Sequence, residues 1–229
     1  SNTKLEAFRS WLASNGAKMD NLEFTRMKGR GSTVVASSDM GRGSSLAFLP
    51  NELIVTREVL DGSAVAKFFA DESYNHLTAL WLLEQLHSDN SFWKPYIESF
   101  PKKLSVSVMW SEEELSALQA SRLAWQSKKW NDEAHLTFGF VIGRTLKEKT
   151  IPESLQWLND VTEEEFKWAL AITSSRAFTS DRSLKYGEYI FVPIEDLFVH
   201  MDPEAVEPMA RVRIGSNGIE FVSNTDTEK

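Results

Sequence analysis

Cysteine is absent from this chain of 229 residues. Without thiols the chain has no disulfide scaffold, no cysteine-ligated zinc site and no thiol nucleophile. Long apolar runs are also absent, because Asp, Glu or Lys interrupts each candidate before it reaches the length of a membrane span. These absences indicate a globular protein whose chemistry does not depend on cysteine, and we expect no membrane association.

Basic residues are outnumbered, since 25 Lys and Arg stand against 33 Asp and Glu and give a formal net charge of −8. Tight, non-specific nucleic-acid binding needs clustered Lys and Arg, so we expect no direct binding to nucleic acid. An acidic surface suits a protein partner with a basic segment, although excess acid often only solvates a surface. We expect an intracellular protein, and nucleus, cytosol and plastid are equally compatible with the composition.

The first residues are typical of a helix that Thr3 caps and Gly16 ends. Leu5, Phe8 and Leu12 recur on one face at the spacing of a helix that packs against a core. We therefore expect an amphipathic helix at the start of the chain.

From residue 24 the periodicity changes to that of short strands. The stretches 34–36 and 46–49 are apolar and rich in β-branched or aromatic residues, with a turn-rich segment between them. Pro50 closes the second stretch. Residues 24–56 are therefore predicted to form a compact β unit.

A hairpin is predicted near the end of the chain. Apolar residues alternate with Arg up to residue 214, and Asn217-Gly218 then gives a strong two-residue turn signal before residues 219–222. The polar residues 223–229 have no evident packing reason to be ordered.

Between the two β segments the pattern is helical. Residues 57–170 carry apolar stripes at helical spacing. Ser111 with Glu114 and Thr162 with Glu165 each match the capping box that begins a helix. The predicted class is therefore α+β, with a β domain of short strands interrupted by a mostly helical insertion.

The predicted organisation has three segments. Residues 1–56 form the N-terminal helix and the first β unit, residues 57–170 the helical insertion, and residues 171–229 the second β portion. This order favours one interrupted β domain over two domains in series.

The sharpest functional signal lies in residues 172–202. Arg176 ends a buried helix, and a β-branched, aromatic strand then leads to Asp196 and His200. An arginine, an aspartate and a histidine beside one strand could hold a small zwitterion. Each also has a structural interpretation: Arg176 as a cation at a helix C-terminus, Asp196 as a turn cap and His200 as a hydrogen-bonded core residue.

Several stretches match one known family in the same order along the chain. They are 35–40 with 46–50, Phe92-Trp93-Lys94-Pro95-Tyr96-Ile97-Glu98-Ser99-Phe100-Pro101, 110–115, 166–169, Ser175-Arg176-Ala177-Phe178, and Val192-Pro193-Ile194-Glu195-Asp196-Leu197. With these stretches the chain resembles SET-domain protein methyltransferases of the Rubisco large-subunit methyltransferase and actin-histidine methyltransferase group. In that group a helical insertion splits the SET β domain.

The resemblance implies transfer of a methyl group from S-adenosylmethionine to a protein side chain, most often lysine, with histidine as a minor option. Such a reaction needs a neutral amine in line with the methyl–sulfur bond and dipoles that favour charge moving from sulfur to nitrogen. The cofactor carries an ammonium, a carboxylate and a sulfonium, so its pocket needs acceptors, a cation and backbone groups at a tight loop. No metal is required.

The resemblance also implies a set of cofactor-binding positions. They are Gly29, Gly31 and Thr33 in the family's glycine loop, Arg176, and Asp196, Val199 and His200 in its Asp-x-x-Asn-His motif. Two of them depart from the family: Val199 stands where it has Asn, and Thr33 stands where it has a second Gly. A valine cannot hydrogen-bond the cofactor, and a side chain at the glycine position would crowd it.

The catalytic residue is not assigned. Family members place a catalytic tyrosine after the Asn-His motif, and none of the four tyrosines here follows His200. We expect that tyrosine beyond Lys229 and negligible turnover by the chain that ends there. The alternative function is a non-catalytic SET-like interaction module with a degenerate cofactor site.

Overall fold

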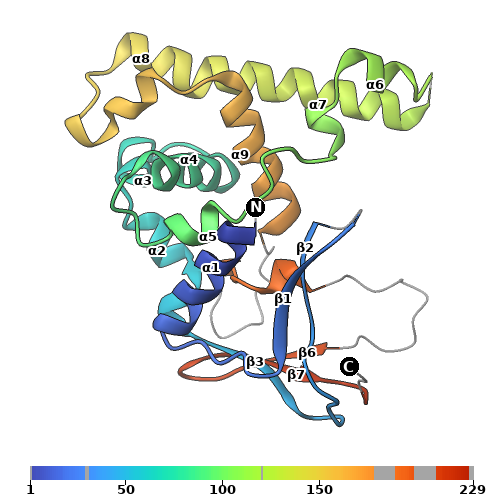
Figure 1. The fold of residues 1–229 in the computed structure, drawn as a ribbon. Coiled ribbons are helices and arrows are strands. Elements are labelled where there is room, and N and C mark those ends of the chain that lie inside the picture. The colour runs from blue at the N-terminus through green and yellow to red at the C-terminus, as the bar shows by residue number, and fades with distance from the viewer. Residues whose placement is uncertain (1, 29–30, 120, 178–188, 199–209, 227–229) are drawn as a thin grey trace. The chain divides into compact units, whose positions relative to one another are not determined.

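The structure, a computed structural model, describes residues 2–28, 31–119, 121–177, 189–198 and 210–226 (Figure 1). Contacts divide the chain into two units. The β unit comprises residues 1–56 and 178–229, and the helical unit comprises residues 57–177. Helix α9 (Glu163–Arg176) continues past residue 170, where the sequence placed the end of the insertion, and stays with the helical unit. Short antiparallel strands in one unit and helices in the other confirm the predicted α+β class.

The β unit contains short strands that pair antiparallel in small sheets. The described strands are β1 (Leu22–Met27), β2 (Gly31–Ala36), β3 (Ser45–Pro50), β4 (Val55–Thr56), β5 (Tyr189–Phe191), β6 (Ala210–Ile214) and β7 (Gly218–Ser223). Strand β1 pairs with β2, the order β3-β7-β6 forms a three-stranded sheet, and β4 pairs with β5. The last two sheets each join the first part of the chain to its last part. The strands predicted at 34–36 and 46–49 are confirmed, whereas β1 was missed.

Helix α1 (Asn2–Ser14) covers part of this unit. Leu5, Phe8 and Leu12 are buried as predicted, with Phe8 and Leu12 completely inaccessible. The helix begins at Asn2, so Thr3 lies inside its first turn and its assignment as N-cap is wrong. Gly16 takes the left-handed φ of 88° that favours glycine just after a helix, which confirms it as the terminating residue.

The predicted hairpin is confirmed in β6 and β7, which pair Ile214 with Ile219. A Cβ on Gly218 would collide with the carbonyl oxygen of Leu49 on β3, so the turn glycine also permits the close approach of β3. The residues that follow are held, contrary to the prediction of a tail without packing. Asn224 is buried, and the carboxylate of Asp226 accepts a hydrogen bond of 2.9 Å from the backbone N–H of Arg42.

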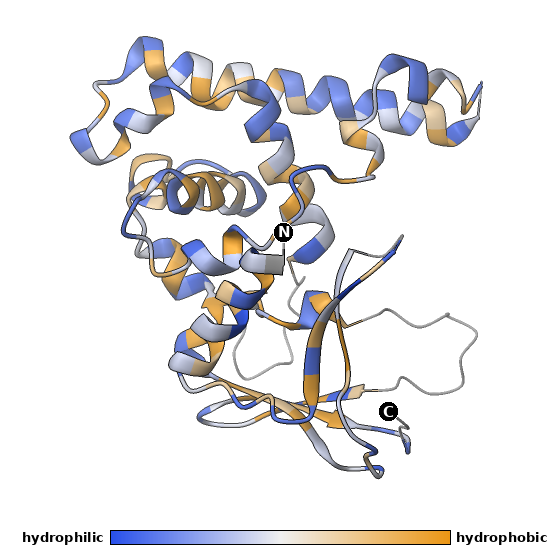
Figure 2. Ribbon diagram, in the orientation of Figure 1, coloured by the Kyte–Doolittle hydropathy of each residue, from blue (hydrophilic) through white to orange (hydrophobic). Residues whose placement is uncertain are grey.

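The helical unit is a continuous stretch of chain. Its α-helices in the described residues are α2 (Arg57–Asp61), α3 (Ala64–Phe68), α4 (Tyr74–His87), α5 (Lys94–Ile97), α6 (Glu112–Ser116), α7 (Arg122–Phe138), α8 (Arg144–Glu148) and α9. Helix α4 packs against α9 and is buried without interruption from Leu77 to Leu83. Its apolar character is visible in Figure 2. None of the helices in the described part of the chain is long and apolar enough to cross a membrane.

Local signals in this unit behave as the sequence predicted. Ser111 and Thr162 both form complete capping boxes, at the starts of α6 and α9. Trp93, Tyr96 and Phe100 are buried, which confirms their interpretation as core residues at the helix junction.

Candidate functional site

A tight turn in the β unit carries the acidic residues of the Val-Pro-Ile-Glu-Asp-Leu stretch. After β5 the chain turns at Ile194 into a short 3₁₀ helix, η5 (Glu195–Leu197). Ile194 is fully buried and has a φ of 78°, a conformation that costs a β-branched residue roughly 1–3 kcal/mol. The backbone N–H of Leu197 donates to the carbonyl of Ile194 over 2.9 Å. The surrounding core therefore imposes the position of η5 against its local preference.

A hydrogen bond from the side chain of Thr33 connects strand β2 to this turn. The hydroxyl of Thr33 donates a hydrogen bond of 2.9 Å to the carbonyl oxygen of Leu197, 164 positions away in the sequence. Thr33 is 2% exposed, so the bond lies in the interior, where an unmet carbonyl is costly. The glycine-loop strand and the acidic turn are therefore side by side within the β unit.

Gly31 begins β2, directly after the loop whose residues 29 and 30 lie outside the described chain. Its φ is 83°, in the left-handed region that favours glycine. Among the described residues, apart from the chain neighbours of Gly31, no atom lies within 4 Å of the place where a Cβ on Gly31 would stand. The backbone at Gly31 is therefore open to a close approach by a ligand.

The electrostatics of the turn are set by two adjacent acids. Desolvation by burial raises the pKa of Glu195 to about 7, and the negative charge of Asp196 acts in the same direction. A carboxyl with this pKa exchanges its proton near neutral pH. A cation placed beside the pair would favour the ionised form of Glu195 and would offset the repulsion from Asp196.

Arg176 lies in the helical unit, as the last residue of α9. Its guanidinium carbon lies 5.3 Å from the ring centroid of the buried Phe100, within the range of a cation–π contact. A cation in the last turn of a helix is also favoured by the helix dipole. The structural interpretation of Arg176 therefore has a specific partner.

The predicted site residues thus fall into separate groups. One group lies where the hydrogen bond from Thr33 joins β2 to η5 in the β unit; it contains Gly31, Thr33 and Asp196, and we call this region the seam. Arg176 belongs to the helical unit. Gly29, Val199 and His200 lie outside the described residues. Within the described part of the chain, no cluster of three or more His, Asp or Glu suits a metal ion.

Glu195 is the residue at this turn to which the sequence assigned no role. It is an acid within a run that is otherwise apolar except for Asp196, and this could have marked it as a carboxyl with a shifted pKa. The hydrogen bond of Thr33 was also missed, because it depends on a contact between distant parts of the chain.

Comparison with known proteins gives consistent relatives. No family model matches the chain. The chloroplastic Rubisco large-subunit N-methyltransferase of Nicotiana tabacum is 26% identical over 217 residues, which cover 94% of this chain and 43% of that protein. The actin-histidine N-methyltransferase of Mus musculus is 24% identical over 173 residues, which cover 72% of this chain and 29% of that protein. The chain thus spans less than half the length of these curated relatives.

Solved structures show the same likeness. A crystal structure of the SET domain of LSMT bound to lysine and AdoHcy matches with a TM-score of 0.80 at 21% identity, covering 100% of this chain and 52% of that chain. Rubisco LSMT bound to AdoMet matches with a TM-score of 0.75 at 21% identity, covering 98% of this chain and 52% of that chain.

Proposed function

We propose that this chain, which has the predicted SET-domain fold and resembles the Rubisco and actin-histidine methyltransferase group, binds S-adenosylmethionine and serves methyl transfer to a protein lysine. The observation that carries the proposal is the hydrogen bond from Thr33 to Leu197. It joins the strand that begins at Gly31 to the turn that carries Asp196, so two of the motifs that the family uses for its cofactor meet in one place.

The residues of the seam fit the chemistry of this cofactor. The cofactor's ammonium needs a carboxylate, and Asp196 supplies one on η5. Glu195, with a pKa of about 7, becomes a second carboxylate when the cation favours its ionised form. A nucleoside ligand also needs backbone without a side chain in the way, and Gly31 supplies it. Thr33 replaces a family glycine, but its hydroxyl is engaged with Leu197 inside the unit, which supports a positioning role.

In the proposed function, Asp196 and Gly31 bind the cofactor, and Thr33 holds the turn and the strand in register. Bound S-adenosylmethionine supplies an activated methyl group on a sulfonium. Arg176, Gly29, Val199 and His200 keep their proposed roles at the cofactor by resemblance to the family. The protein partner is proposed to present its side chain to this region, and a basic segment would suit the acidic chain.

Isothermal titration calorimetry of the 229-residue chain with S-adenosylmethionine tests the proposal. We expect saturable binding that weakens at least about tenfold in Asp196→Asn, because one charge-assisted contact contributes roughly 1.5–3 kcal/mol. Asp20→Asn, an exposed acid of the same unit, is the matched control and should leave the affinity unchanged. A folded chain that shows no binding heat with S-adenosylmethionine would contradict the proposal.

The second candidate is a non-catalytic interaction module, and the apolar groove described in the next subsection favours it. The two candidates separate on cofactor binding, which the module does not need. The plant relatives are chloroplastic enzymes, and this supports our proposal of an intracellular location.

A further inference from the structure

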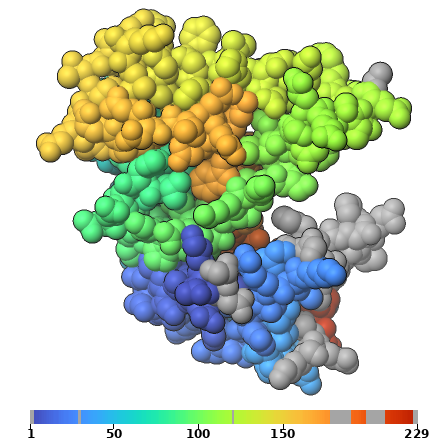
Figure 3. Space-filling model, turned by 45° about the horizontal axis from the view of Figure 1, so that its top comes forward, coloured from blue at the N-terminus to red at the C-terminus, as the bar shows by residue number. Residues whose placement is uncertain are grey.

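The helical unit carries a groove of about 490 Å³ that the cofactor chemistry does not use. Its walls come from the start of α4, the second half of α7, the following π-helical turn η3 (Gly139–Gly143), and α9. The apolar part of the lining includes Trp130, Leu136, Phe140 and Leu170. We call this surface the α7 groove; helix α7 lies at the surface of the helical unit in Figure 3.

Large apolar side chains in the α7 groove are exposed to an unusual degree. Phe140 is 67% exposed, Leu136 57% and Trp130 38%. The residues that follow Phe140, Val141 and Ile142, are almost completely buried, so the π-helical turn is anchored from inside while Phe140 stands outward. π-helical turns within α-helices are rare and occur frequently at functional sites. Exposed apolar clusters with a polar rim are typical of binding surfaces.

The groove is acidic. The ionisable residues in its lining are Glu72, His76 and Glu133. Glu133 contacts Lys129 over 3.6 Å, but both side chains are more than half exposed, and such solvent-exposed pairs contribute little to stability. Glu72 contacts His76 over 3.0 Å. A partner that brings Lys or Arg would therefore meet two carboxylates beside an apolar surface, whereas an acidic partner would be repelled.

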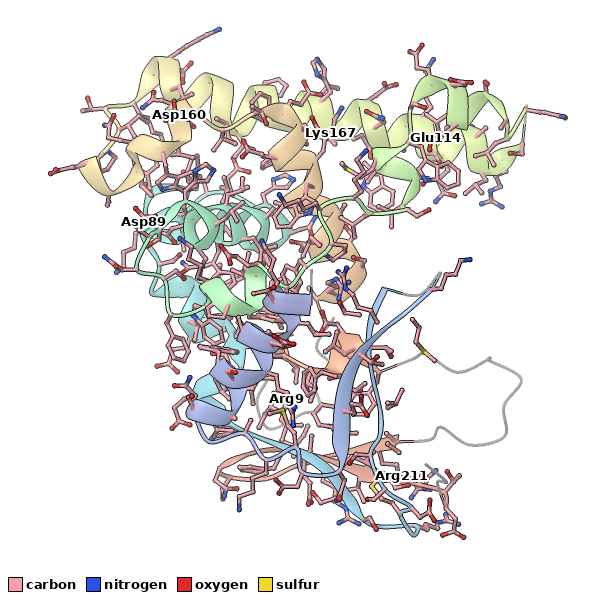
Figure 4. All side chains as sticks on the ribbon, in the orientation of Figure 1. Arg9, Asp89, Glu114, Asp160, Lys167 and Arg211 are labelled. Carbon is pink, nitrogen blue, oxygen red and sulfur yellow. The ribbon has the colours of Figure 1, made fainter. Side chains whose placement is uncertain are left out.

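The walls of the groove are held in place by polar contacts between α7 and α9. The ammonium of Lys167 on α9, labelled in Figure 4, donates to the side-chain oxygen of Asn131 on α7 over 2.8 Å. Within α9 the same ammonium lies 2.6 Å from a carboxylate oxygen of Glu163. The imidazole of His135 lies 2.8 Å from the other oxygen of Glu163. A preformed groove binds with less loss of conformational entropy than one that must be ordered by its partner.

We propose that the α7 groove docks a short segment of another protein, in which a bulky apolar side chain stands next to Lys or Arg. The apolar side chain packs against Phe140, Leu136 and Trp130, and the cation pairs with Glu133 and Glu72. The lining of the α7 groove contains none of the residues proposed to bind the cofactor.

Fluorescence anisotropy with labelled synthetic peptides tests the proposal on the whole 229-residue chain. The probe peptides alternate Leu or Phe with Lys or Arg. One reference set replaces each Lys and Arg by Glu, and another replaces each Leu and Phe by Ser. We expect saturable binding of the basic apolar peptides, at least about tenfold tighter than that of either reference set, since both kinds of contact contribute.

Two pairs of variants locate the binding. Phe140→Ala should weaken it about tenfold or more, while Trp125→Ala, on the preceding helix α7 and equally exposed at 67% but outside the groove, should not. Glu133→Lys should weaken it similarly, while Asp132→Lys, which changes the charge by the same amount one position away, should not. Circular dichroism confirms the fold of each variant.

Three outcomes overturn the proposal. The first is equal binding of the peptides that carry Glu. The second is equal weakening by a groove variant and its control, which would show non-specific adhesion to an acidic, apolar surface. The third is concentration-dependent dimerisation in sedimentation experiments that Phe140→Ala abolishes, which would make a second copy of this chain the occupant.

Discussion

The helical unit is one continuous stretch of chain, whereas the β unit is assembled from both ends of it. The helices of the helical unit are stabilised by local features such as capping boxes and by burial of side chains along α4 and α9. The elements of the β unit are held together by contacts between residues far apart in the sequence, such as the hydrogen bond from Thr33 to Leu197. We therefore expect the helical unit to tolerate loss of a polar contact better than loss of core volume, and the β unit to be sensitive to both.

Removal of core volume from the helical unit should have the largest effect. Trp81 on α4 is 1% exposed, and Trp81→Ala should cost about 3–5 kcal/mol through lost burial and the cavity left behind. Urea unfolding followed by far-UV circular dichroism measures the change. Trp125→Ala is the control and should stay within about 0.5 kcal/mol, since Trp125 is 67% exposed.

The next largest effect is expected where the two ends of the β unit meet. Gly218→Ala should destabilise the protein by about 3 kcal/mol, because the added Cβ meets the carbonyl oxygen of Leu49 and the ring of Phe48. Gly41→Ala, where the added Cβ makes only an ordinary contact of 3.8 Å, serves as control. Equal melting temperatures for the two variants would show that β3 does not approach the turn this closely.

Loss of the hydrogen bond from Thr33 to Leu197 should cost about 1–2 kcal/mol. Thr33→Val keeps the shape but leaves the buried carbonyl of Leu197 without this donor. Thr25→Val, directly opposite in the β1–β2 register, is the matched control and should cost less. Denaturant unfolding of Thr33→Ser, which keeps a hydroxyl, should show partial recovery; no difference between Ser and Val would argue against the bond.

The raised pKa of Glu195 predicts a pH dependence confined to the β unit. In the folded state this carboxyl has a pKa of about 7 and stays protonated up to about that pH. In the unfolded chain it ionises at its usual, lower pKa. Its contribution to stability is therefore complete below the unfolded pKa and is lost as pH rises through about 7, by about 1–3 kcal/mol. Glu195→Gln should match the parent near pH 5 and be more stable near pH 8.5 in thermal unfolding. Equal stability of Glu195→Gln and the parent at both pH values would contradict this prediction.

The smallest effects are expected at the two capping boxes. Both serine and threonine caps contribute about 1 kcal/mol to their helices, but α9 carries buried residues and α6 carries none. Thr162→Ala should therefore lower global stability by about 1 kcal/mol, whereas Ser111→Ala should mainly loosen the first turn of α6. Hydrogen exchange of the first-turn amides, measured together with global unfolding, distinguishes local loosening from a loss of global stability. A loss of global stability in Ser111→Ala would contradict this prediction.

Much of the fold could be predicted from the sequence, because its signals are local. Thr162 with Glu165 and the turn Asn217-Gly218 specify their structures within four residues. Strand β1 was missed because its burial pattern does not alternate, and Leu22 is its one buried residue. Thr3 was misplaced as a cap because helix ends shift by one or two residues without a strong signal.

The candidate site was harder to predict than the fold. The resemblance proposed Gly31 and Asp196 as cofactor positions, whereas the hydrogen bond of Thr33 depends on a partner 164 positions away. The raised pKa of Glu195 depends on desolvation, which the sequence shows only indirectly. The exposure of Phe140 beside the buried Val141 depends on the π-helical turn, which interrupts the simple helical spacing.

The division of the β unit between the two ends of the chain has a consequence for its synthesis. The amide of Asn51, just after β3, donates to the carbonyl of Ser216, 165 positions later. A ribosome adds roughly 5–20 residues per second, so β3 emerges roughly ten to thirty seconds before its partner β7. During this interval β3 presents an open strand edge, which is the feature most prone to pairing with other nascent chains. The helical unit, complete earlier, can fold first and limit the region that a chaperone must shield.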